Sequence, residues 1–179
     1  PYLTDTVAGF ENAYLKADAL GINAYFSLFD VSTDADAVRF AGLTNAQAFQ
    51  EIRAKSLPAL ALNVSTQVAT AAKYNLKVVA FESGNSLWPP YPARSNTSLE
   101  AKLTSLQRDP EMKVVYTQFL NEWFGAGGQV LLHHTDVFPY SAQAGWFGSL
   151  EYVQQPRAQA PKHDALMTFI ENNRNLVTP

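Results

Sequence analysis

The chain has 179 residues and a mass of 19.7 kDa, a size that suits one domain with its own core, so we expect residues 1–179 to form a single domain segment. Its 13 basic and 16 acidic residues give a formal net charge of −3 with no basic cluster, so nucleic acid is not an expected partner. The absence of cysteine excludes disulfides and a thiol nucleophile, and no apolar run approaches the roughly 20 residues of a membrane span, so no membrane partner is expected either.

The composition and two short motifs also indicate a partner chain and a secretory route. Apolar residues make up 47% of the chain and charged residues only 16%, which indicates surface that is covered by its own fold or by another chain. The triplets Asn63-Val-Ser65 and Asn96-Thr-Ser98 fit the acceptor pattern for N-glycosylation. Pro1 at the first position indicates a processed chain or a piece of something longer. We therefore expect a secreted or extracellular glycoprotein.

The first half of the chain predicts one strand among helices. Residues 1–17 read as a connection and a helical stretch, and residues 18–26 read as a short buried strand that ends near Tyr25. A loop rich in Ser, Thr and Asp is expected over 27–36. From 43 to 75 the pattern is helical in two pieces, with Thr44 or Asn45 as cap and a break at Ser56-Leu-Pro58.

The next strand, near residues 76–82, carries a carboxylate. Val78 to Phe81 are four consecutive apolar residues, typical of a strand that is buried on both faces, and Glu82 follows where this run stops. The carboxyl ends of parallel strands carry the chemistry in α/β folds, so Glu82 is placed as a catalytic group. The alternative is a carboxylate that caps or salt-bridges a loop.

The second half predicts a loop, two helices, a strand and a last helix. The loop 83–96 contains Trp88 and Tyr91 among prolines, and these rings suit either the wall of a sugar site or an ordinary lid. A capping box at 97–100 opens a helix to about Arg108, and a strongly amphipathic helix follows from Asp109 to Gly125. Residues 129–136 form the third buried strand, and the final helix contains Leu166, Phe169 and Ile170.

The third strand holds the adjacent residues His133 and His134. Neighbouring residues of a regular strand point to opposite faces, so the two rings cannot hold one metal ion together and at most one of them lines a site. No glycine-rich phosphate loop follows any of the strands. We expect neither a metal nor a cofactor.

Several short motifs between Val78 and Ile170 resemble the C-terminal part of the carbohydrate-active (β/α)8-barrel proteins in the large clan of cellulases and β-galactosidases. The motifs are Phe81-Glu-Ser-Gly84, Asp109-Pro-Glu-Met112, Trp123 with Gly127-Gly128, Gly145-Trp-Phe-Gly148 and Pro161-Lys-His-Asp-Ala-Leu166. The preceding strand at 18–26, with its tyrosine, extends the resemblance to most of the chain, and the middle from 30 to 75 is unmatched. The implied fold is α/β, the C-terminal portion of a TIM barrel, at about its sixth to eighth strands.

The resemblance also implies roles for individual residues. In that clan a glutamate on the seventh strand attacks the anomeric carbon and a tyrosine from the sixth strand orients it. Here these positions are Glu82 and Tyr25, the candidate catalytic pair. The expected substrate is a β-linked polysaccharide, and the side chains expected to bind it are His133, Asp136, Trp88, Trp146 and Tyr91.

The chain departs from the clan in one essential respect. A retaining glycosidase needs two carboxyl groups about 5 Å apart, and the acid/base glutamate of the clan ends a fourth strand for which this chain has no counterpart. A whole barrel needs about 250 residues, so we expect an N-terminal barrel segment or a second chain to complete it. Two alternatives stay open: a carbohydrate-binding protein that does not cleave its ligand, and a structural or storage subunit that binds something apolar.

Overall fold

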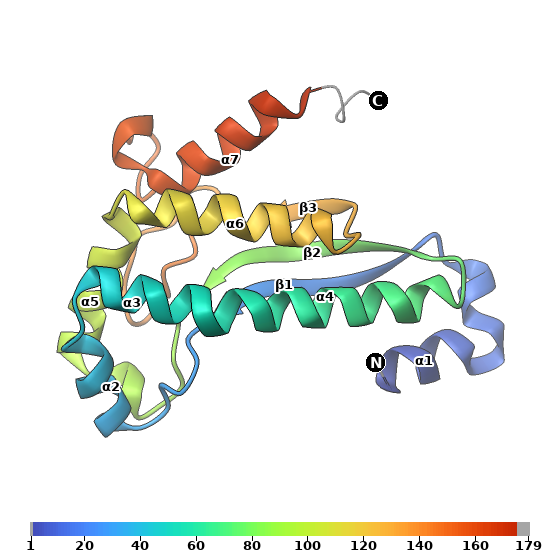
Figure 1. The fold of residues 1–179 in the computed structure, drawn as a ribbon, viewed down its shortest axis with the longest axis horizontal. Coiled ribbons are helices and arrows are strands. Elements are labelled where there is room, and N and C mark those ends of the chain that lie inside the picture. The colour runs from blue at the N-terminus through green and yellow to red at the C-terminus, as the bar shows by residue number, and fades with distance from the viewer. Residues whose placement is uncertain (1, 175–179) are drawn as a thin grey trace.

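The structure is a computed structural model that describes residues 2–174. Its centre is a parallel sheet in the order β1-β2-β3, formed by β1 (Ala19–Ser27), β2 (Lys77–Ser86) and β3 (Val130–His133). This confirms the predicted mixed α/β architecture with three parallel strands separated by helices (Figure 1). β2 runs on to Ser86, so Glu82 lies within the strand, and the prediction that it is at the strand's C-terminal end is wrong.

An irregularity between β1 and β2 explains how Glu82 is presented. Ile22 pairs with Ala80, but the next residue, Asn23, pairs with Glu82, which leaves Phe81 as the additional residue on β2. Such a bulge bends the strand and redirects the side chains beside it. The pairing then continues from Ala24 and Ser83 to the ends of both strands.

The N-terminal half is mostly helical. Its elements are α1 (Tyr2–Gly9), the 3₁₀ segment η1 (Phe10–Lys16), α2 (Asp34–Ala41), α3 (Asn45–Glu51), the π turn η2 (Ile52–Ser56) and α4 (Leu57–Ala72). The loop predicted over 27–36 is shorter than expected, because Thr33 and Asp36 form a capping box that starts α2. Thr44 caps α3, as predicted, through a second box with Gln47.

The predicted break at Ser56-Leu-Pro58 is absent. α3, η2 and α4 follow one another without a loop and form one rod from Asn45 to Ala72. Pro58 has no N–H, and its ring crowds the carbonyl four residues earlier, at Ala54. That carbonyl belongs to the wider π turn, which therefore takes up the strain inside the helix.

The C-terminal half contains η3 (Ala93–Ser95), α5 (Thr97–Arg108), α6 (Glu111–Gly125), η4 (Arg157–Gln159) and α7 (Pro161–Asn172). The cap of α5 is Asn96, whose Oδ1 accepts the Leu99 N–H at 3.0 Å, and not the predicted Thr97. The apolar stripe predicted for α6 is confirmed as core. It consists of Met112, Val115, Tyr116, Phe119, Leu120 and Trp123, all buried.

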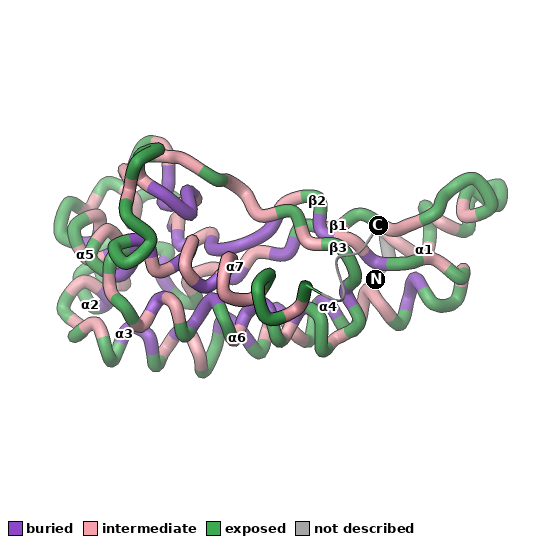
Figure 2. The backbone as a smooth tube through the Cα atoms, turned by 90° about the horizontal axis from the view of Figure 1, so that it is seen from above, coloured by how far each residue is buried: buried purple, intermediate pink, exposed green. Residues whose placement is uncertain are grey.

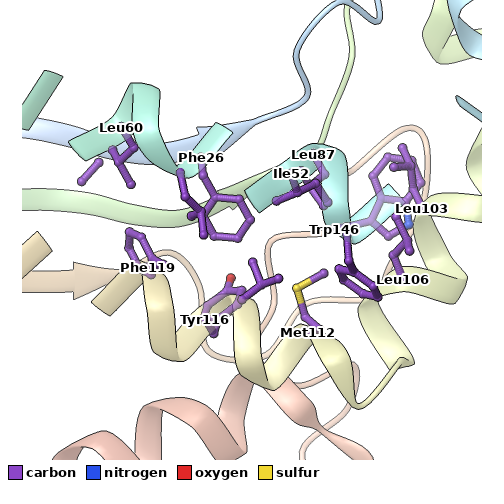
Figure 3. Packing of buried hydrophobic residues seen from close by; sticks show 14 of the residues in the cluster. Phe26, Ile52, Leu60, Leu87, Leu103, Leu106, Met112, Tyr116, Phe119 and Trp146 are labelled. Carbon is purple, nitrogen blue, oxygen red and sulfur yellow. The ribbon is translucent and has the colours of Figure 1, made fainter. Parts of the chain in front are cut away.

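The helices lie mainly on one side of the sheet. α4 and α6 run along this side, and α1 lies at one end of the molecule (Figures 1 and 2). Between sheet and helices, Phe26 of β1 packs against the rings of Tyr116 and Phe119, with centroids 5.6 and 5.5 Å away (Figure 3). Towards α5 the same core continues through Leu103, Leu106 and Trp146.

The opposite face of the sheet is largely uncovered and apolar. Phe81 is 53% exposed, Val130 53% and Leu132 58%. β2 is the only described strand that pairs with β1 or with β3, so each of these two strands has one edge without a strand partner among residues 2–174. None of the described helices is long and apolar enough to cross a membrane.

The Phe119 ring tests the core between sheet and helices. The variant Phe119→Ala leaves a cavity beside Phe26 and Tyr116, and we expect it to lower the free energy of unfolding by about 3–5 kcal/mol. The matched control on the same helix is Val114→Ala, because Val114 is half exposed and its truncation should cost less than about 0.5 kcal/mol. Urea denaturation of both variants measures the difference; equal losses would contradict this packing.

Candidate functional site

The structure brings the predicted catalytic pair together. The Tyr25 hydroxyl donates a hydrogen bond to Glu82 Oε2 at 3.3 Å, across the β1–β2 junction just beyond the bulge. Burial raises the pKa of Tyr25, and the negative charge and hydrogen bond of Glu82 raise this pKa further. Tyr25 therefore stays protonated at neutral pH and holds the carboxylate as a hydrogen-bond donor.

Aromatic rings surround Tyr25. The Phe147 ring lies 6.1 Å from the Tyr25 ring, 5.9 Å from Trp88 and 5.3 Å from His134, each time edge to face. His134 also meets the edge of Tyr25 at 6.4 Å. Tyr25, Phe147, His134 and Trp88 form the wall that we call the aromatic wall. Flat apolar faces of this kind pack against the C–H faces of sugar rings.

Two members of the aromatic wall, His134 and Phe147, were missed in the sequence. Their immediate neighbours, His133 and Trp146, were predicted instead. His133 is the last residue of β3, and neighbouring residues at the end of a strand face opposite ways, so His134 faces Tyr25 while His133 does not. The sequence shows that the two neighbours face opposite ways, but it does not show which of them faces Tyr25.

His133 faces α6 instead of Tyr25. Its Nε2 lies 3.2 Å from the Tyr116 hydroxyl, and that hydroxyl oxygen accepts two N–H groups of Asn85, from the backbone at 3.1 Å and from Nδ2 at 2.9 Å. With its oxygen occupied in this way, Tyr116 donates its proton to Nε2, so His133 is neutral and carries its own proton on Nδ1. Burial, assisted by the charge of Lys162, lowers the pKa of His133 to about 3.

This polar network continues to α7. Asn85 Nδ2 also donates to the Trp146 carbonyl at 3.0 Å, and the fully buried Lys162 Nζ donates to the same oxygen at 2.7 Å. Lys162 Nζ further lies 4.5 Å from the centroid of the Tyr140 ring. Burial lowers the pKa of Lys162 well below its ordinary value. The network joins β2, β3, α6 and α7 under the strand that presents Glu82.

Gly84 is required where this network meets the strand. Its φ is +122°, and a Cβ there would lie 2.9 Å from His133 Nε2 and 3.1 Å from the Tyr116 hydroxyl. The glycine of the predicted motif therefore serves a close approach below Glu82. The neighbouring Ser83 is buried and donates to the Leu132 carbonyl at 2.9 Å.

Besides His133, three more of the predicted sugar-binding residues lie away from Tyr25 and Glu82. The Trp146 ring is 2% exposed and donates from Nε1 to Thr104 Oγ1, so it belongs to the core and offers no open stacking face. Asp136 is exposed and lines a hollow under α7. Tyr91 is 71% exposed in the loop after β2.

Trp88 is held in place by its own loop. The Arg94 guanidinium lies 3.7 Å from the centroid of the Trp88 ring, and Trp88 Nε1 donates to the Ala142 carbonyl at 2.8 Å. Arg94 also donates to the Pro89 carbonyl and lies 5.0 Å from the Tyr91 centroid. One face of Trp88 is thus covered by a cation, and the ring meets the aromatic wall through Phe147.

Among the described residues, Glu82 is the carboxylate of the site, and there is no cluster of metal ligands. Glu82 is the only carboxylate among residues 2–174 whose charge raises the pKa of Tyr25. No group of three or more His, Asp or Glu side chains in the described part of the chain could hold a metal ion. Comparison with protein-family models, curated proteins and solved structures found no match to the chain. The assignment of a function therefore depends on this geometry.

Acidification tests the neutral His133. The folded pKa is about 3 and the unfolded pKa is about 6.5, so between these values the unfolded chain binds a proton that the folded chain does not. The folded state should lose up to about 1.4 kcal/mol of stability from this group for each pH unit below 6.5. Urea denaturation between pH 7 and 4.5 measures how the free energy of unfolding depends on pH. In His133→Gln this dependence should be weaker than in the wild type by about one bound proton. An unchanged dependence would contradict a neutral His133.

Proposed function

We propose that this chain is the C-terminal portion of a glycoside hydrolase barrel that cleaves β-linked polysaccharide with retention, with Glu82 as nucleophile. The observation that carries the proposal is the hydrogen bond from Tyr25 to Glu82 on the uncovered side of a parallel sheet. A nucleophile needs a carboxylate held in one orientation, and this bond supplies that orientation. The aromatic wall beside it offers a surface for the sugar ring.

The chemistry assigns a separate step to each group. A Glu82 oxygen attacks the anomeric carbon, the glycosidic C–O bond breaks, and the departing oxygen takes a proton from a second carboxyl group. Water then attacks the glycosyl ester, gives its proton to that second group and releases Glu82. Tyr25 keeps its proton and positions the carboxylate throughout. The second carboxyl group would come from the N-terminal barrel segment or second chain that completes the barrel.

A partner segment explains the uncovered sheet face. Phe81, Val130 and Leu132 form an apolar surface, and β1 and β3 each have an edge that pairs with no described strand. Parallel sheets are normally covered on both faces, and free edges invite further strands. We infer that further barrel strands, from an N-terminal segment or a second chain, cover this surface and bring the acid/base group. A secreted glycoprotein remains the expected setting.

A carbohydrate-binding protein on the same scaffold is the second candidate. It is favoured by the single carboxylate of the site and by the highly exposed Tyr91 ring in the loop after β2. In this case Glu82→Gln leaves the affinity for polysaccharide nearly intact. In the hydrolase, the same change abolishes turnover.

Covalent trapping tests Glu82 without the missing acid. A 2,4-dinitrophenyl 2-deoxy-2-fluoro-β-glycoside has a leaving group that departs without protonation, so the nucleophile alone can form the glycosyl ester. Incubated with a panel of such glycosides, the chain should gain the mass of one fluorosugar, located on Glu82 by peptide mapping. Glu82→Gln should gain none.

The matched control for trapping is Glu122→Gln on α6, which should be labelled as fast as the wild type. Tyr25→Phe should be labelled more slowly, because it removes the group that orients the carboxylate. Saturable binding of polysaccharide with no label on any glycoside would support the binding protein instead. Labelling of another glutamate would contradict the assigned role of Glu82.

The inferred partner has its own measurement. Intact-mass analysis of native material under denaturing conditions, beside its size in solution, should reveal a second polypeptide of one to two hundred residues or a longer precursor, about what a barrel of 250 residues or more still lacks. Native material made only of a 19.7 kDa monomer would contradict the barrel proposal.

A further inference from the structure

α7 lies across α6 and leaves two hollows that the proposed sugar chemistry does not use. The rings of Phe124 on α6 and Phe169 on α7 are stacked, with centroids 5.2 Å apart and planes at 12°. One hollow has a volume of about 410 Å³ and the other about 850 Å³. Both are lined by this ring pair together with Leu131 and Ile170, so they adjoin.

The smaller hollow is an apolar pocket with polar groups among its lining residues. α6, β3 and α7 supply its apolar lining, including Leu120, Leu131, Leu166 and Met167. Asp136 and Ser149 from the segment after β3, with His163 of α7, supply polar groups. Its volume is within the range of small-molecule sites, which combine an apolar lining with a few polar groups that orient the ligand.

Asp136 gives this pocket a charge preference. Its Oδ1 accepts the Ser149 hydroxyl at 3.1 Å, and no ion pair neutralises the carboxylate within residues 2–174. His133, which also lines the pocket, is neutral and directs Nε2 to Tyr116. An unpaired carboxylate beside an apolar pocket complements a ligand with an apolar body and a cationic head.

We propose that the pocket between α6, β3 and α7 binds an amphipathic amine, with its alkyl body against Leu166 and Met167 and its ammonium group at Asp136. The adjoining larger hollow gives a longer alkyl chain room to extend past the Phe124–Phe169 stack. This site is separate from Glu82 and is independent of whether the chain acts on sugar.

The two methionines of the chain provide a test. Met167 lines the pocket, whereas Met112 is fully buried in the core and serves as an internal reference. In a chain labelled with [methyl-¹³C]methionine, titration with octylamine should shift the Met167 methyl signal saturably and leave the Met112 signal in place. Octylamine should bind more tightly than hexylamine, by up to about fourfold for each added methylene group.

The head group is tested by octanol and octanoate at the same concentrations. We expect octylamine to bind about fivefold more tightly than octanol, as an ion pair at a partly solvated site allows, and octanoate most weakly. Asp136→Asn keeps an oxygen for Ser149 and should remove the advantage of the amine over the alcohol. The matched control is Asp34→Asn, at the start of α2, which should change neither affinity.

A second variant tests the apolar lining independently of the charge. Met167→Gln is nearly isosteric and should weaken the binding of octylamine and of octanol alike. Because this variant has no Met167 methyl signal, its binding is measured by the change in melting temperature when ligand is added. Equal affinity of the wild type for amine, alcohol and carboxylate would overturn the proposal, and so would the absence of a saturable Met167 shift. A Met167 signal that moves with protein concentration alone would show that a second copy fills the pocket, which also overturns it.

Discussion

The Tyr116 hydroxyl is the contact on which the rest of the structure depends. It accepts two N–H groups of Asn85 and donates to His133, so one oxygen fixes α6 to the ends of β2 and β3. Through Asn85 and the Trp146 carbonyl, the same network reaches Lys162 on α7. Buried polar groups of this kind are costly unless every partner is in place. The bonds made by the Tyr116 hydroxyl, Asn85 Nδ2 and Lys162 Nζ therefore favour one arrangement of strands and helices, although Asn85 Oδ1 has no partner among the described residues.

The two faces of the sheet carry different groups: one packs against the helices, and the other presents Tyr25 and Glu82. On the helix side, Phe26 and the α6 stripe supply the apolar burial, and the Tyr116 network fixes the strands. On the other side, Tyr25 and Glu82 lie beside exposed apolar residues and the aromatic wall. A bulge at Phe81 marks the change between a regular ladder and the segment that presents the carboxylate. This division fits our proposal that further strands complete both the fold and the catalytic pair.

Long, periodic patterns predicted the fold well, whereas single residues of the site were harder to predict. The α6 stripe and the strands β1 and β2 could be read from apolar spacing, because burial imposes that spacing directly, whereas β3 is shorter than the predicted buried strand 129–136 and has two exposed residues. The choice between His133 and His134, or between Trp146 and Phe147, depends on which of two neighbours faces the sheet's open side. A shift of one residue in the alternation exchanges the two neighbours. Bulges and strand ends produce such shifts, and these depend on tertiary contacts. The length of β2 and the π turn before Pro58 also depend on tertiary contacts and were not predicted.

The π turn also determines where the long rod from Asn45 to Ala72 tolerates a change in length. Adding or removing a residue within a regular helix rotates everything beyond it by about 100°, which here would turn Leu60 and Val64 away from the sheet. The turn from Ile52 to Ser56 already contains a residue beyond the α-helical count. A deletion there keeps the buried faces of α3 and α4 in phase, although it removes the wider turn that accommodates the Pro58 ring. The rod thus has one position at which its length can vary without disturbing the sheet that carries Glu82.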